Sequence, residues 1–163
     1  MVQADQGPIY LSGEGRTRLE GRLAAYETEL QQRDADAGGA EAEDTVDQAT
    51  DLEAGDDRIR LRGLISAARL VLDRAQPLPS QPDDGVVRQG ATVRVRDEAR
   101  GEEQYRLVDG AELDPAAAEA ALDSPVGRAL LGRARGDRIT IRTPAGERVL
   151  TILSVEPYRV LAT

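Results

Sequence analysis

Apolar residues in the first half of the chain follow the alternating three- and four-residue spacing that marks one face of a helix. In the segment 13–36 they are Leu19, Leu23, Tyr26 and Leu30. In the segment 57–76 they are Leu61, Ile65, Ala68, Leu72 and Ala75. Two helices with such a stripe bury it against each other when a turn joins them. The pattern therefore predicts an antiparallel coiled-coil hairpin.

The ends of the two predicted helices can also be placed. Ser12 is a suitable N-cap for the first helix, and Glu14 lies near the positive end of its dipole. The second helix is expected from about Gln48 to Ala75, which makes it roughly 40 Å long. Folding the hairpin about residue 42 leaves the apolar stripes facing each other near its base and thin toward the turn. We therefore expect a projecting arm rather than part of a compact core.

The second half of the chain changes to the two-residue alternation of β-strands. Strands rich in β-branched residues are predicted over 91–97, 103–109, 137–143 and 147–156. Short turns that contain glycine join the first two strands and the last two. Between these pairs, Ser124 can cap a short helix that has Pro125 at its first position. This half is predicted to be a small α+β domain with an antiparallel sheet.

A proline-rich segment separates the two halves. Three prolines lie in the stretch 76–85, which can form neither a helix nor an inner strand. We therefore divide the chain into an N-terminal hairpin over 1–78 and a C-terminal domain over 79–163. The predicted fold class is α+β.

Composition excludes several kinds of chemistry. The 163 residues include no Cys and no His, which rules out thiolate nucleophiles, the usual zinc sites and imidazole-dependent catalysis. With a formal net charge of −9, the chain is not expected to bind nucleic acid strongly by itself. Alternate strand positions carry arginines that we expect on a solvated sheet face, namely Arg94, Arg96, Arg138 and Arg142.

The N-terminal residues show neither the basic nor the apolar region of a signal peptide. Uninterrupted apolar runs stay well below the roughly 18 residues that a membrane-spanning helix needs. These features predict a cytoplasmic protein that does not enter a membrane.

The stretch 40–57, between the two predicted helices, carries eight carboxylates and no positive charge. A run of like charges is typical of a solvated turn whose acids repel one another. A carboxylate cluster is also what Mg²⁺ binds, through oxygen ligands and retained waters. One such turn cannot complete an octahedral site, so a metal ion would have to be shared with another molecule. The residues alone leave both interpretations open and favour the solvated turn.

Three segments carry a resemblance to a known family. They are "LSGEGRTRLEGRLAAYE" near the N-terminus, an acidic D-x-x-[DE] turn between the hairpin helices, and "LDSPVGRALLGRARGDRITIRTPAGERVLTILSVE" in the second half. Together they resemble the bacterial Gre family of transcription elongation factors, of the GreA type, over nearly the whole chain. The resemblance implies an N-terminal antiparallel coiled coil and a C-terminal domain of FKBP-like fold.

The resemblance also implies a partner, bacterial RNA polymerase. In this family the C-terminal domain docks at the outer rim of the secondary channel, and the coiled coil enters that channel. The acidic tip then helps hold an active-site Mg²⁺ jointly with the polymerase's own aspartates, so that water attacks backtracked RNA. Such a protein is an accessory factor and not itself an enzyme. We expect a monomer that meets nucleic acid mainly through the polymerase complex and binds no cofactor tightly by itself.

Aligned with the motifs of the family, "DTVD" falls at the acidic turn. Asp44 would then be an oxygen ligand of the exchangeable Mg²⁺, and Asp47 would ligate it or orient the attacking water. In the second half, Asp123, Ser124 and Pro125 match the loop that docks on the polymerase. A capped helix start is an alternative explanation of the same three residues.

The acidic turn also departs from the family. Asp47 stands where the family has Glu, so its carboxylate reaches about one methylene less, and metal chemistry is sensitive to such displacements. The turn also carries more acids than the family motif, and in this it resembles the tip of inhibitory Gre-like factors, which occupy the same channel. The alternative function is therefore a channel-occupying inhibitor of RNA polymerase without productive cleavage activity. A proline isomerase, suggested by the FKBP-like fold, is disfavoured because the chain has no Phe or Trp to line a proline pocket.

Overall fold

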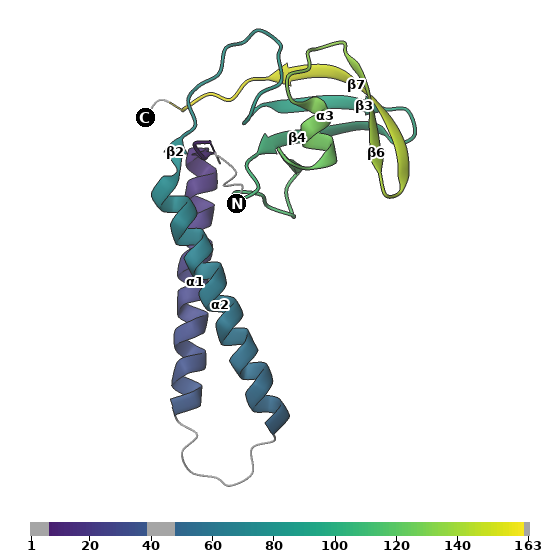
Figure 1. Cartoon of the computed structure of the whole chain (residues 1–163). Coiled ribbons are helices and arrows are strands. Elements are labelled where there is room, and N and C mark those ends of the chain that lie inside the picture. The colour runs from purple at the N-terminus through teal and green to yellow at the C-terminus, as the bar shows by residue number, and fades with distance from the viewer. Residues whose placement is uncertain (1–6, 39–47, 162–163) are drawn as a thin grey trace, which may run out of the picture. The chain divides into compact units, whose positions relative to one another are not determined.

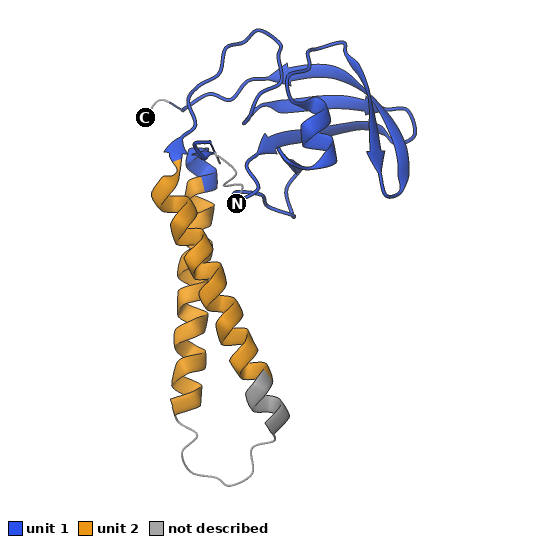
Figure 2. Ribbon diagram, in the orientation of Figure 1, with its two compact units in different colours: residues 1–15, 76–163 blue, residues 16–75 orange. Residues whose placement is uncertain are grey.

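The computed structural model describes residues 7–38 and 48–161, with the side chains of 48–52 outside the description. Two compact units share these residues (Figure 2). The helical unit spans 16–75, and the sheet unit combines 1–15 with 76–163. None of the described helices is long and apolar enough to cross a membrane.

Two long helices make up the helical unit and run antiparallel beside each other (Figure 1). Helix α1 spans Gly13–Gly38 and helix α2 spans Gln48–Arg74. Both lie within two residues of the predicted bounds, because the spacing of the apolar residues is a local signal that one helix face carries by itself. The predicted helical hairpin is confirmed.

Apolar burial in the helical unit is concentrated toward one end of the hairpin. The buried side chains are Leu19, Leu61, Ile65 and Ala68. Farther along α1, Leu30 is half-buried and the residues from 34 to 38 are exposed. Ion pairs replace apolar contacts there, since Arg33 lies 2.6 Å from Asp57 and 2.9 Å from Glu29. The predicted thinning of the apolar stripes toward the turn is confirmed for the described residues.

A five-stranded sheet forms the centre of the sheet unit, in the order β5-β4-β3-β7-β6. The strands are β3 (Thr92–Asp97), β4 (Gly101–Val108), β5 (Glu119–Ala121), β6 (Arg138–Thr143) and β7 (Gly146–Glu156). Helix α3 (Pro125–Leu130) packs against β5 and β6 (Figure 1). The four longer strands and α3 match the predicted elements, and the predicted α+β fold class is confirmed.

Alternation along the strands separates the core of the sheet unit from its solvated face. Val93 and Val95 of β3 are completely buried, whereas Arg94 and Arg96 between and after them are exposed. The buried cluster comprises Val87, Ala91, Val93, Val95, Leu107, Leu130, Ile139, Ile141, Leu150 and Ile152. On the solvated face, Arg94 and Arg96 lie 2.8 and 3.0 Å from Glu102. The predicted solvated arginine face is confirmed.

Two strand pairs are parallel and were not part of the predicted antiparallel sheet. The three-residue strand β5 pairs with β4, and the two-residue strand β1 (Tyr10–Leu11) pairs with β2 (Gln76–Pro77). The backbone N–H of Leu78 also donates to the carbonyl of Leu11 at 2.8 Å. Both leucine side chains are buried, so residues from the start of the chain complete the sheet unit.

Candidate functional site

The loop between β5 and α3 contains the three residues that the sequence assigns to docking. The hydroxyl of Ser124 accepts a hydrogen bond from the backbone N–H of Gly127 at 3.0 Å and donates to the carbonyl of Ala121 at 2.7 Å. Pro125 follows as the first helical residue, where a missing N–H costs nothing. The predicted N-cap is therefore confirmed, and this hydroxyl is used within the loop.

Helix α3 approaches the preceding strand so closely that one position excludes a side chain. A Cβ atom on Gly127 would lie 2.0 Å from the carbonyl oxygen of Ala121. The same turn is held by the N–H of Leu122, which donates to Val108 of the neighbouring strand at 2.9 Å. The loop is thus tied to the sheet on both sides, and its outward residues are presented on a rigid support.

The three predicted docking residues differ in what they offer to a partner. Asp123 and Pro125 are exposed, whereas Ser124 is half-buried and turned into the cap. Within the described part of the chain, the Asp123 carboxylate has no side-chain hydrogen bond or ion pair. An exposed acid next to a rigid proline can contact another molecule without first breaking an internal bond. Their docking role stays a prediction.

The two predicted metal ligands, Asp44 and Asp47, lie outside the described residues. In sequence they fall between the end of α1 at Gly38 and the start of α2 at Gln48. Among the residues that the structure does describe, no group of three or more acids is arranged to hold a metal ion. Their role as Mg²⁺ ligands therefore stays a prediction.

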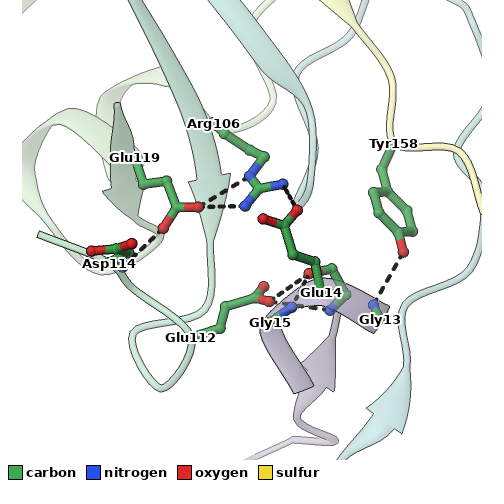
Figure 3. A network of polar contacts seen from close by, with 9 residues as sticks. Gly13, Glu14, Gly15, Arg106, Glu112, Asp114, Glu119 and Tyr158 are labelled. Carbon is green, nitrogen blue, oxygen red and sulfur yellow. Dashed lines mark hydrogen bonds and ion pairs between the residues drawn. The ribbon is translucent and has the colours of Figure 1, made fainter. Parts of the chain in front are cut away.

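A buried carboxylate that the sequence did not single out lies at the start of α1 (Figure 3). Glu112 is 1% exposed, and its Oε2 accepts hydrogen bonds from the hydroxyl of Ser12 at 2.7 Å and from the Ser12 N–H at 3.3 Å. Its Oε1 has no hydrogen-bond partner among the described residues. Burial raises the pKa of Glu112, and the Ser12 hydrogen bonds oppose that shift in part.

The contact between Ser12 and Glu112 also explains which residues form the first turn of α1. Ser12 accepts a hydrogen bond from the N–H of Gly15 at 2.9 Å, as its predicted N-cap role requires, while it donates to Glu112. A Cβ atom on Gly15 would lie 1.4 Å from Oε2 of Glu112. Gly15 thus leaves the space that the carboxylate occupies.

An ion-pair network extends from this turn along β4 and β5 (Figure 3). Arg106 lies 2.9 Å from Glu14 and also contacts the buried carboxylate of Glu119. Glu119 in turn accepts a hydrogen bond from the N–H of Asp114 at 2.9 Å. The sequence placed Glu14 at a helix dipole but gave no sign of Arg106, which is 92 residues away in the chain. All of these hydrogen bonds and ion pairs join residues of the sheet unit.

Three comparisons place the chain among known proteins. The family described as "Transcription elongation factor, GreA/GreB, C-term" matches residues 81–157. Transcription elongation factor GreA of Chloroflexus aurantiacus is 36% identical over 152 residues, which cover 91% of this chain and 97% of that protein. GreA of Roseiflexus sp. is 33% identical over 153 residues, with 91% and 98% covered. Among solved structures, that of Thermus aquaticus Gfh1 is similar at 26% identity and a TM-score of 0.43, covering 91% of this chain and 98% of that one.

Proposed function

The chain belongs to the GreA/GreB family of transcription elongation factors, and from this membership we propose that it stimulates bacterial RNA polymerase to cleave backtracked RNA. The observation that carries the proposal is the similarity to GreA over 91% of the chain. In the proposed mode of action the helical hairpin enters the secondary channel of the polymerase. The sheet unit docks at the outer rim of that channel. The protein acts as a cytoplasmic, monomeric accessory factor, and the polymerase performs the hydrolysis.

Asp44 and Asp47 have the chemistry that this function needs. Carboxylate oxygens are preferred ligands of Mg²⁺, and the ion would be completed by ligands of the polymerase. Asp44 supplies one oxygen ligand, and Asp47 supplies another or orients the attacking water. When held there, Mg²⁺ would supply a bound water of lowered pKa and positive charge at the attacked phosphodiester. Because the ion is shared, the free chain is not expected to hold it tightly.

The docking role of the 123–125 loop is supported by its geometry. The Asp123 carboxylate is exposed, and Pro125 is exposed beside it at the start of α3. Ser124 contributes indirectly, because its two hydrogen bonds fix the loop. We expect Asp123→Ala and Pro125→Ala each to weaken binding to RNA polymerase several-fold without unfolding the sheet unit. An unchanged dissociation constant in both variants would assign the loop a purely structural role.

The decisive experiment is an RNA-cleavage assay on a stalled, backtracked elongation complex of the matching polymerase. We expect the wild-type chain to release short 3′ RNA fragments, and Asp44→Ala and Asp47→Ala each to abolish most of that release. The matched control is Asp36→Ala, which removes the same charge from an exposed position of α1. Equal activity in all four proteins would contradict the assignment of Asp44 and Asp47.

The alternative function is a channel-occupying inhibitor, and the residue at position 47 favours it. Asp reaches about one methylene less than the Glu of the family motif, which weakens metal chemistry that depends on position. The variant Asp47→Glu separates the two functions. A factor with weakened cleavage gains activity in this variant, whereas an inhibitor slows nucleotide addition and releases no RNA fragments in either form.

A further inference from the structure

The twelve arginines of the sheet unit differ in their side-chain partners. Eight lie within ion-pair distance of a described acid, namely Arg88, Arg94, Arg96, Arg106, Arg138, Arg142, Arg148 and Arg159. In contrast, Arg128, Arg133 and Arg135 are exposed and have no ion pair or side-chain hydrogen bond with any described residue. These three fall within eight consecutive residues, on α3 and in the segment after it. Among the described residues of the sheet unit, the remaining arginine without such a partner is Arg100, so three of its four unpaired arginines lie close together in sequence.

The outer face of α3 presents part of this group together with apolar atoms. Pro125 and Arg128 are exposed and lie three residues apart on α3, and the exposed Leu131 follows the helix as its C-cap residue. Leu131 is 46% exposed, whereas its neighbour Leu130 is completely buried in the core. The inner face is fixed to the sheet, so the outer face is a rigid surface.

The segment after α3 holds the other two arginines in a fixed backbone. The N–H of Gly132 donates to Val87, the N–H of Val87 donates to Arg133, and the N–H of Arg135 donates to Gly85. Ala134 forms the central bridge of this short extended pairing. Arg133 and Arg135 flank the bridge residue Ala134 in sequence, and both are exposed.

The chemistry of this surface fits an acidic protein partner better than nucleic acid. The exposed acid Asp123 adjoins Pro125, and it would repel a phosphate backbone. The residues from 111 to 137 include no aromatic side chain on which a base could stack, and the chain has a net charge of −9. Arginines around an exposed leucine and proline match a protein surface on which acids surround an apolar contact.

We propose that Arg128, Arg133 and Arg135, with Leu131 among them, form a docking surface for an acidic patch of RNA polymerase. This inference rests on the proposed function and extends the docking loop at 123–125 to the whole outer face of α3 and the segment after it. The loop gives the surface one acid and a rigid proline. The three arginines give it charge that attracts the partner and fixes the orientation of binding.

The test compares the affinity of the full chain and its variants for matching core RNA polymerase at low and high salt. We expect Arg128→Glu and Arg133→Glu each to weaken binding about tenfold at low salt, and less at high salt because salt screens exposed charges. Arg133→Lys keeps the charge and should bind within a few-fold of wild type. We expect Leu131→Ser to weaken binding with little change in the salt dependence.

The matched control is Arg100→Glu. Arg100 is also exposed and unpaired among the described residues, but it lies in the turn between β3 and β4. We expect less than a twofold effect from this variant. Circular dichroism checks that all variants keep the wild-type fold, which is expected because none of the substituted side chains is buried.

Four outcomes overturn the inference, and they are distinguishable from one another. If wild type binds polymerase and the Arg128 and Arg133 variants bind equally well, the docking surface lies elsewhere and the proposed function stands. If Arg100→Glu weakens binding as much as they do, net charge is the cause. If wild type binds single-stranded RNA and the variants lose that binding, the surface is a phosphate-binding one. A wild-type chain that does not bind polymerase at all overturns the proposed function, and this inference with it.

Discussion

Glu112 and Asp97 are both almost completely buried, yet their pKa values shift in opposite directions. Burial dominates at Glu112, where one oxygen has no partner among the described residues. Asp97 accepts hydrogen bonds from the backbone N–H groups of Ala99 and Arg100 and from Arg148 at 2.7 Å, and these lower its pKa. The number of donors around a carboxylate, more than its depth, decides which form the fold prefers.

The shift at Glu112 predicts a pH dependence of stability. Because its pKa is raised in the folded chain, Glu112 stabilises fully below the ordinary glutamate pKa of about 4.3, and this contribution is lost as pH rises through the raised value. We expect Glu112→Gln to remove that loss, so that the variant gains stability relative to wild type as pH rises. Urea unfolding of both proteins over a pH series measures the difference. A difference that does not change with pH would contradict the assignment.

Gly127 predicts a steric effect. We expect Gly127→Ala to destabilise the sheet unit by about 2 kcal/mol or more, because the new methyl group would meet the carbonyl of Ala121. The control is Gly21→Ala in α1, where the added methyl group meets nothing and should stabilise the helix by up to about 1 kcal/mol. Urea unfolding followed by circular dichroism compares them. Two substitutions of equal effect would show that α3 moves away from β5 at little cost.

Among the elements, those with a repeated local pattern could be predicted and those without one could not. The apolar stripe from Leu19 to Leu30 repeats often enough to indicate a helix, and the alternation of apolar and polar residues through β3 indicates a strand. Strand β5 has the sequence Glu-Ala-Ala, which favours helix, and becomes a strand because it pairs with β4. Strands β1 and β2 are two residues each, too short to show any period.

In the candidate site, too, local features could be predicted from the sequence and contacts between distant residues could not. Ser124 and Pro125 act through neighbouring residues, so their capping geometry could be predicted from the sequence. The hydrogen bond between Ser12 and Glu112 joins residues 100 positions apart in the chain. A local sequence pattern cannot predict such a distant partner. The unpaired state of Arg133 is likewise a property of the folded surface, because it depends on which acids lie within reach.

We expect substitutions at the two ends of the helical hairpin to differ in their effect on its stability. We expect Ile65→Ala to cost about 2–4 kcal/mol, because Ile65 is buried and its loss leaves a cavity. Arg33→Ala should have a smaller effect that decreases at high salt, since Arg33 and its partners Glu29 and Asp57 are partly exposed to solvent. Thermal unfolding at low and high salt, followed by helical circular dichroism, measures both. A larger loss in the Arg33 variant would show that ion pairs hold the hairpin together.

At the scale of the whole molecule, the sheet unit is built from both ends of the chain. Leu11 is 2% exposed, and its strand pairs with a strand that begins at Gln76. We expect Leu11→Ala to destabilise the sheet unit by about 2–4 kcal/mol. The control Val160→Ala removes an exposed side chain and should change stability by less than about 0.5 kcal/mol.

Hydrogen exchange gives that prediction a local readout. Faster exchange in the Leu11 variant should appear at Leu78, whose N–H bonds to the Leu11 carbonyl, and in the turn around Glu112. Unchanged exchange at both places would show that the N-terminal residues merely cover the sheet unit and do not support it.

Strands β1 and β2 also make the helical hairpin an inserted domain. α1 begins two residues after β1 ends, at Gly13, and α2 ends at Arg74, two residues before β2 begins. Gln76, the first residue of β2, lies opposite Tyr10, the residue before the end of β1, so the two connections leave the sheet unit within about one residue of each other, as in proteins that accept foreign domains within a loop. Hairpins from other family members, longer or shorter by whole heptads, can therefore be transplanted between Gly15 and Gln76 to make chimeras. In such chimeras the reach of the arm would vary while the host domain stays constant.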